Sequence, residues 1–124
     1  VKIASDVAEW TRKFATVSIG YDKWTAGAIA SRLAAARFNV IDVSGATFGQ
    51  ACDETLTGLN SKRLQHTGND ILTTHFMACV KKPMADGGWR VVRKDSHTNI
   101  SAAVASIIAV HHASKTQSET TFAF

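Results

Sequence analysis

The sequence lacks the features of a membrane protein or a disulfide-stabilised protein. Its two cysteines, Cys52 and Cys79, fall in segments with a helical pattern and form no CxxC or Cys/His metal-ligand spacing. We interpret them as buried free thiols of an intracellular protein rather than as a bridge. The longest apolar run, residues 100–110, is too short to cross a bilayer, and the first residues show no signal-peptide core. We therefore expect a soluble protein without membrane contacts.

Repeats, low-complexity segments and internal linkers are also absent. A chain of 124 residues favours one domain that can bury a core without disulfides or metal ions. Its 45% hydrophobic and 19% charged residues are ordinary for a globular protein, which excludes a disordered or fibrous class. The net charge of +4 permits a polyanion partner without requiring one.

Helical and strand patterns alternate in the first part of the chain. Asp6 and Glu9 have the spacing of a capping box and predict the start of a first helix. Period-two alternation over residues 17–21 predicts a strand, and alanine-rich residues 25–37 predict a second helix. The β-branched run in 39–43 predicts a second strand, buried on both faces. Strand, helix and strand in this order predict a parallel pair.

The rest of the chain is mainly helical. Residues 46–64 predict one kinked helix or two short ones, with an apolar stripe of Phe48, Cys52, Leu56 and Leu59. A further helix can be capped by Asn69 or Asp70 and ends at residues 81–83, and residues 89–93 predict a short strand or an extended segment. Residues 100–114 predict a last helix with His111 and His112 near its end, and we expect 115–124 to be a flexible tail.

Three polar side chains in these elements have two readings each. Asp22 follows the first strand, where open α/β sheets place their chemistry, but Asp also caps helices. The local pattern favours the cap. Asp42 is either an edge-facing polar residue or a site residue, and the first reading is favoured. For His75, a hydrogen-bonded, partly buried histidine is favoured over a metal ligand because no second ligand lies one turn away.

Basic residues gather around one aromatic side chain, Trp89. Such a group can neutralise phosphates, but a charged run is often only a solvated face, and the sequence does not decide between the two. The candidate DNA contacts are Lys81, Lys82, Arg90, Arg93 and Lys94.

Four segments in a fixed order resemble a known family. They are SIGYDKWTAGAIASRL, NVIDVSG, RLQHTGNDILTTHFMACV and RKDSHTNISAAVASIIAVHHAS. Together they resemble the C-terminal part of the large terminase subunit of tailed bacteriophages. The resemblance implies an α/β, partial ribonuclease-H-like fold: a short, mainly parallel sheet flanked by helices, without the first strands. Residues 1–114 would be this nuclease-like portion, of phage or prophage origin, acting in the cytoplasm of a bacterial host.

The resemblance also implies a site. In this family, carboxylates from the first strand, a later strand and the last helix hold two Mg²⁺ or Mn²⁺ ions that cut DNA during packaging. Asp22 matches the second carboxylate, as a catalytic and metal-binding residue, which reverses the preference for a plain cap. Ser101 stands at the last acid, and the first-strand acid has no counterpart. A metal-dependent endonuclease with one carboxylate would have little or no activity.

Other roles remain open under the resemblance. The chain can be a non-catalytic module that binds double-stranded DNA or assembles with other terminase or capsid-portal components. It can also be an inert prophage fragment. The absent strands would uncover a sheet edge and an apolar face, which predicts a homo-oligomer. We also expect this chain to lack the family's ATPase domain, since no phosphate-binding Gly-x-x-x-x-Gly-Lys-Ser/Thr run occurs in it.

Overall fold

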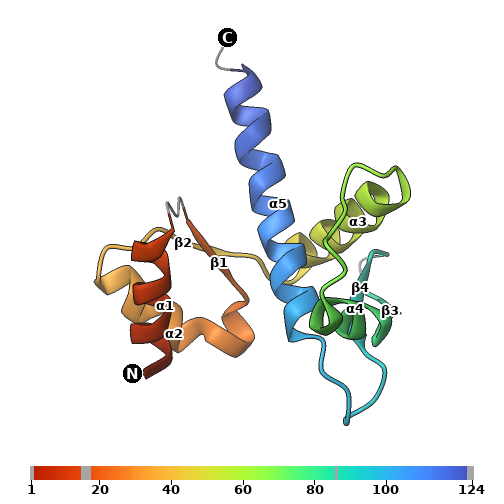
Figure 1. Ribbon diagram of the computed structural model, residues 1–124, viewed down its shortest axis with the longest axis horizontal. Coiled ribbons are helices and arrows are strands. Elements are labelled where there is room, and N and C mark those ends of the chain that lie inside the picture. The colour runs from red at the N-terminus through yellow and green to blue at the C-terminus, as the bar shows by residue number, and fades with distance from the viewer. Residues whose placement is uncertain (1, 15–17, 86, 123–124) are drawn as a thin grey trace. The chain divides into compact units, whose positions relative to one another are not determined.

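The computed structural model describes residues 2–14, 18–85 and 87–122, with side chains described to residue 115. The chain forms two compact units, Val1–Ser44 and Gly45–Phe124, which we describe separately. The elements are α1 (Lys2–Lys13), β1 (Ile19–Tyr21), α2 (Lys23–Ala35), β2 (Val40–Asp42), α3 (Ala46–Asn60), α4 (Asp70–Met77), β3 (Cys79–Pro83), β4 (Trp89–Arg93) and α5 (Ser101–Phe122) (Figure 1).

The first unit contains the predicted parallel strand pair. β1 pairs with β2 in parallel, with Ile19 opposite Val40, and α2 connects them. Position 17, predicted to belong to the first strand, lies outside the described residues. Both strands are half-buried or exposed, so the prediction of burial on both faces is wrong. In the described part of the chain this sheet has two strands, and a strand without neighbours on both sides cannot be enclosed.

The first helix starts four residues before the predicted capping box. α1 begins at Lys2, so Asp6 lies inside the helix and does not cap it. Its carboxylate instead lies 3.5 Å from the ammonium of Lys2, one turn earlier. Opposite charges at this spacing face each other on a helix and support it. α1 packs against α2, as Figure 1 shows.

The core of the first unit is small. The buried hydrophobic side chains of this unit are Ala30 and Leu33 of α2 and Val43, which follows β2. The backbone N–H of Val43 donates to the carbonyl of Tyr21 at 2.7 Å and extends the parallel ladder by one residue. α2 thus anchors the strand pair through one face.

α3 is a single helix, so the predicted kink is wrong. Gly58, the expected weak point, lies in its last turn, and the chain folds back directly after it. The backbone N–H of Leu64 donates to the carbonyl of Gly58 at 3.2 Å. The Leu64 side chain covers the glycine so closely that a Cβ there would lie 2.6 Å from Leu64 Cδ1. The glycine therefore serves a close approach rather than a bend.

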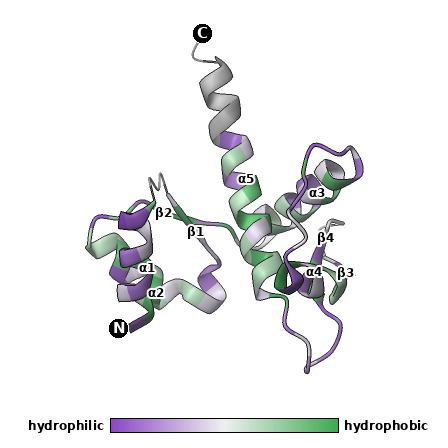
Figure 2. Cartoon of the chain, in the orientation of Figure 1, coloured by the Kyte–Doolittle hydropathy of each residue, from purple (hydrophilic) through white to green (hydrophobic). Residues whose placement is uncertain are grey.

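α3 and α5 form the core of the second unit. The buried face of α3 consists of small residues, whereas Leu59, from the predicted stripe, is 39% exposed. Small side chains let α3 and α5 approach closely, and the larger buried side chains come from the isoleucines of α5. The first half of α5 is mainly apolar in Figure 2. The buried hydrophobic side chains are Ala51, Cys52, Ala103, Ile107 and Ile108.

α4 and the β3–β4 hairpin complete the second unit. The Asn69 side chain accepts a hydrogen bond from the Leu72 N–H at 3.1 Å, which confirms the predicted cap. The helix ends at Met77, and Cys79 begins β3, so the prediction of a helix running to Pro83 is wrong. β3 pairs antiparallel with β4, the predicted strand, and the tight turn between them uses Gly87 at a φ of 92°.

α5 is longer than predicted. It begins at Ser101 and continues to Phe122, past the expected end near Ser114. His111 is therefore not near the end of the helix, as the sequence suggested. Its Nδ1 lies 2.7 Å from a carboxylate oxygen of Glu54 on α3, which ties the two helices together. Within the described residues, no helix is long and apolar enough to span a membrane.

Candidate functional site

Asp22 lies where the sequence places it, at the carboxyl end of β1 and directly before α2. Its backbone is extended, and its carboxylate accepts hydrogen bonds from the Trp24 N–H and the Thr25 hydroxyl, both at 3.3 Å. The side chain is half-buried. Asp22 is therefore a helix cap, and the same carboxylate stands at a strand end typical of metal and phosphate sites in α/β sheets.

Asp42 ends the neighbouring strand at the same edge. It lies opposite Tyr21 in the parallel register, so these two side chains share a face of the sheet. The extended backbone continues from Tyr21 to Asp22, and alternation turns Asp22 to the other face. Asp42 is exposed and accepts a hydrogen bond from the Ser44 hydroxyl. The two carboxylates thus end adjacent strands without facing each other.

The donor set of the first unit does not fit a two-metal centre. Two divalent ions require several oxygen ligands, and Asp22 supplies one carboxylate whose oxygens already accept two hydrogen bonds. Across the part of the chain that the structure describes, no group of three or more His, Cys, Asp or Glu side chains could hold a metal ion. We therefore derive no reaction step through such ions.

Ser101, which the sequence resemblance placed at the family's last acid, begins α5 in the second unit. Its backbone N–H donates to the Asn99 side chain at 2.9 Å. The next N–H, of Ala102, donates to Nδ1 of His75 on α4 at 2.9 Å. His75 is half-buried, so the prediction of a hydrogen-bonded, partly buried histidine is confirmed. Sequence reasoning missed its partner, since 27 residues separate the imidazole from the amide.

The predicted basic cluster lies on and beside the β3–β4 hairpin. Lys81 is opposite Val91, Lys82 opposite Arg90, and Cys79 opposite Arg93. Because residues opposite each other share a face and neighbours alternate, the cations divide between two faces. Lys81 and Arg93 share a face with Trp89; Lys82 and Arg90 share the other. All four cations are exposed, as is Lys94 after the strand.

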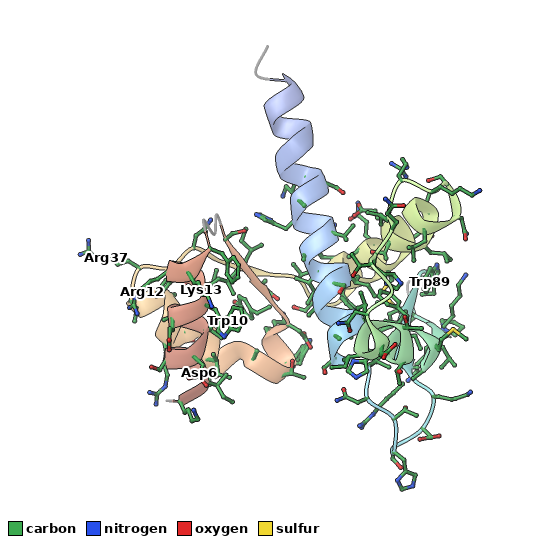
Figure 3. All side chains as sticks on the ribbon, in the orientation of Figure 1. Asp6, Trp10, Arg12, Lys13, Arg37 and Trp89 are labelled. Carbon is green, nitrogen blue, oxygen red and sulfur yellow. The ribbon has the colours of Figure 1, made fainter. Side chains whose placement is uncertain are left out.

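The face of Lys81 also carries an aromatic contact. The Lys81 ammonium lies 4.3 Å from the centroid of the Trp89 ring, within cation–π range. Trp89 is half-buried and labelled on the hairpin in Figure 3. The contact holds one cation in a defined place above an aromatic surface. Strand alternation would have assigned the basic residues to two separate faces from the sequence alone, but the sequence did not predict that β3 is a strand.

The two cysteines are free, as predicted. Burial raises the pKa of the Cys52 thiol despite a backbone hydrogen bond with Val91 and the charge of Arg90. Burial also raises the pKa of Cys79, and the neighbouring Cys52 raises it further. Both thiols therefore stay protonated at neutral pH and are poor nucleophiles.

Comparisons with known proteins agree with this arrangement. Residues 2–117 match the family model described as terminase large subunit, endonuclease domain. The fold is similar to the crystal structure of the HK97 bacteriophage large terminase, with a TM-score of 0.71 and 19% identity. That similarity covers 89% of this chain but 24% of the HK97 chain, so this chain spans about a quarter of that protein. No curated protein matches. The α/β, ribonuclease-H-like fold expected from the sequence is confirmed, and the chain belongs to the family of terminase large subunit endonuclease domains.

Proposed function

We propose that this chain is a phage or prophage terminase nuclease domain in which Asp22 is the remaining metal-ligand position, and that the chain alone cuts DNA little or not at all. One observation carries the proposal: in a chain of this family, Asp22 directly follows a strand of a parallel pair. By family resemblance the ion would be Mg²⁺ or Mn²⁺, which prefer carboxylate oxygens.

The donor chemistry supports weak activity. Ser101 offers a neutral hydroxyl where the family pattern has a carboxylate, and a neutral oxygen holds a hard cation less tightly. Asp42 stands at the same sheet edge but on the other face, so it does not pair with Asp22. One carboxylate holds two ions poorly, because their mutual repulsion then has little negative charge to offset it.

Two variants of Asp22 separate the cap from the metal ligand. Asp22→Asn keeps an oxygen that can accept the Trp24 N–H but removes the charge, whereas Asp22→Ala removes both. We expect supercoiled plasmid incubated with Mg²⁺ or Mn²⁺ to stay uncut by the wild-type chain at enzyme concentrations that suffice for an active nuclease. Metal-dependent nicking that Asp22→Asn abolishes without loss of stability would contradict low activity and establish Asp22 as a ligand.

A second candidate function is a non-catalytic module that binds double-stranded DNA. It is supported by the Lys81, Trp89 and Arg93 face of the hairpin, where the Lys81 ammonium lies over the Trp89 ring and Arg93 lies further along the same face. Cations that contact phosphates release bound counterions, so this binding would weaken steeply with salt. Assembly with other packaging components and formation of a homo-oligomer are proposals of the same class.

The two faces of the hairpin provide a matched test of DNA binding. Lys81→Glu with Arg93→Glu, and Lys82→Glu with Arg90→Glu, change the net charge equally but on opposite faces. We expect the first pair to abolish salt-sensitive binding to duplex DNA and the second to reduce it much less. Equal losses would show only a general charge effect, and no measurable binding by the wild-type chain would reject this function.

A further inference from the structure

The first helix carries an exposed apolar stripe. Ile3, Trp10 and Phe14 are 61%, 60% and 55% exposed. Val7, between them, is half-buried. Large apolar side chains gathered on one surface are uncommon in a protein that stays alone, and they mark contact sites.

The spacing of the stripe is that of helices that pair. Positions 3, 7, 10 and 14 are separated by four, three and four residues, which is the alternation of the d and a positions of a heptad. Ala4, Ala8 and Thr11 lie to one side of the stripe and are half-buried, and α1 packs on α2. The stripe therefore borders the α2 contact and leaves its other side to solvent.

The aromatic part of the stripe is ordered. The rings of Trp10 and Phe14 stack with centroids 5.5 Å apart and planes 11° apart. The Lys13 ammonium lies 5.4 Å from the Trp10 centroid. Stacked rings lose little further freedom on binding, so they make favourable anchors of an interface.

The solvent side of the stripe carries charges of both signs: Lys13, and Asp6, which lies 3.5 Å from the Lys2 ammonium one turn earlier. Asp6 and Lys13 are seven residues apart, both precede a core position of the heptad, and both are exposed. Figure 3 labels them with Trp10 on α1. When two copies of such a helix run antiparallel, these flanking positions face each other, and Asp6 of each copy meets Lys13 of the other. In a parallel pair, Asp6 would face the neutral Thr11.

We propose that α1 is a self-association surface on which a second copy of this chain docks, with the two α1 helices antiparallel. Ile3, Val7, Trp10 and Phe14 form the apolar centre, and two symmetry-related Asp6–Lys13 ion pairs flank it. The arrangement is self-complementary, as a two-fold interface requires. It rests on α1 alone and is independent of DNA cleavage and DNA binding.

Charge exchange tests the antiparallel register. Asp6→Lys places two cations opposite each other in a homodimer, and Lys13→Asp places two anions there. We expect each variant alone to sediment mainly as a monomer at a concentration where the wild-type chain is a dimer. An equimolar mixture should recover the dimer, because each flanking pair then joins a cation of one variant to a carboxylate of the other.

Neighbouring residues supply matched controls. Glu9→Lys and Arg12→Asp make the same charge changes on the same helix but away from the stripe, and we expect both to remain dimers. Trp10→Ser should give a monomer whose circular dichroism shows the helices intact. A monomeric wild-type chain at all concentrations would overturn the proposal and leave the stripe to another partner. Failure of the mixture to dimerise would overturn the antiparallel pairing.

Discussion

The two units differ in the size of the apolar core that each encloses. Both expose some large apolar side chains, such as Trp24 at 76% in the first and Met77 at 77% in the second. The first buries only Ala30, Leu33 and Val43, whereas the buried core of the second unit is larger and includes Ile107 and Ile108. A unit of the size of Val1–Ser44 has little interior, since surface dominates in short chains. The candidate carboxylate thus belongs to the part of the chain that depends most on further contacts.

The largest expected effects compare one core residue from each unit. Leu33→Ala and Ile107→Ala should each lower the free energy of unfolding by about 2–5 kcal/mol, because both leave a cavity. Trp10 and Trp24 report on the first unit and Trp89 on the second. To follow one unit at a time by fluorescence, the tryptophans of the other unit are replaced by Phe. In denaturant titrations we then expect Leu33→Ala to shift mainly the unfolding transition of the first unit. Equal shifts in both transitions would show that the units unfold together.

A smaller effect is expected where a glycine permits close packing. Gly58→Ala should lower stability by about 1–3 kcal/mol, because the new Cβ overlaps Leu64. Gly27→Ala in α2 is the control, since nothing lies within 4 Å of its Cβ position. That variant should gain up to about 1 kcal/mol from helix propensity. Thermal unfolding of the pair would contradict this account if Gly58→Ala were as stable as Gly27→Ala.

The contact between α4 and α5 predicts a further difference. His75→Ala should cost about 0.5–2 kcal/mol, the usual range for losing a helix cap, because the Ala102 N–H loses its acceptor. The exposed His97 provides the control, and His97→Ala should leave stability unchanged. Chemical denaturation measures both. If both variants lost the same unfolding free energy, the effect would come from removing a histidine and not from losing the acceptor of the Ala102 N–H.

The smallest expected effect is a gain. The hydroxyl of Thr55 on α3 is buried and has no hydrogen-bond partner among the residues that the structure describes. Thr55→Val removes it with little change of shape, so stability should rise by up to about 1 kcal/mol. A decrease in the unfolding midpoint would show that the hydroxyl is satisfied in solution. The gain should appear in the unfolding transition that Trp89 fluorescence reports, since α3 packs against β4.

Local patterns were sufficient for part of the fold. The alternation around Ile19, the alanine-rich α2 and the β-branched run at Val40 predicted the parallel pair and placed Asp22 at its end. Asn69 was a recognisable cap because its partner, Leu72, lies three residues away. In each of these cases the interaction that stabilises the element is close in sequence.

The errors arose where distant contacts decide the structure. β3 lacks a strand pattern of its own, and it forms because Val80 pairs with Val92 across the hairpin. The sequence around Asp6 fitted a capping box, but an ion pair between Asp6 and Lys2, one turn earlier in the helix, is equally compatible with that sequence. For the candidate site, the alternation that separates Asp22 from Asp42 could not be stated before the register was known. The prediction for Ser101 rests only on the family pattern.

Metal binding at Asp22, the proposed remaining ligand position, can be measured without cleavage. We expect Mn²⁺, titrated into the 15N-labelled full chain, to broaden the amide signals around Asp22 before others. Asp22→Asn should abolish that broadening while leaving the dispersion of the spectrum intact. Broadening centred on another acidic segment, or unchanged by Asp22→Asn, would show that this carboxylate is a helix cap and not a metal ligand.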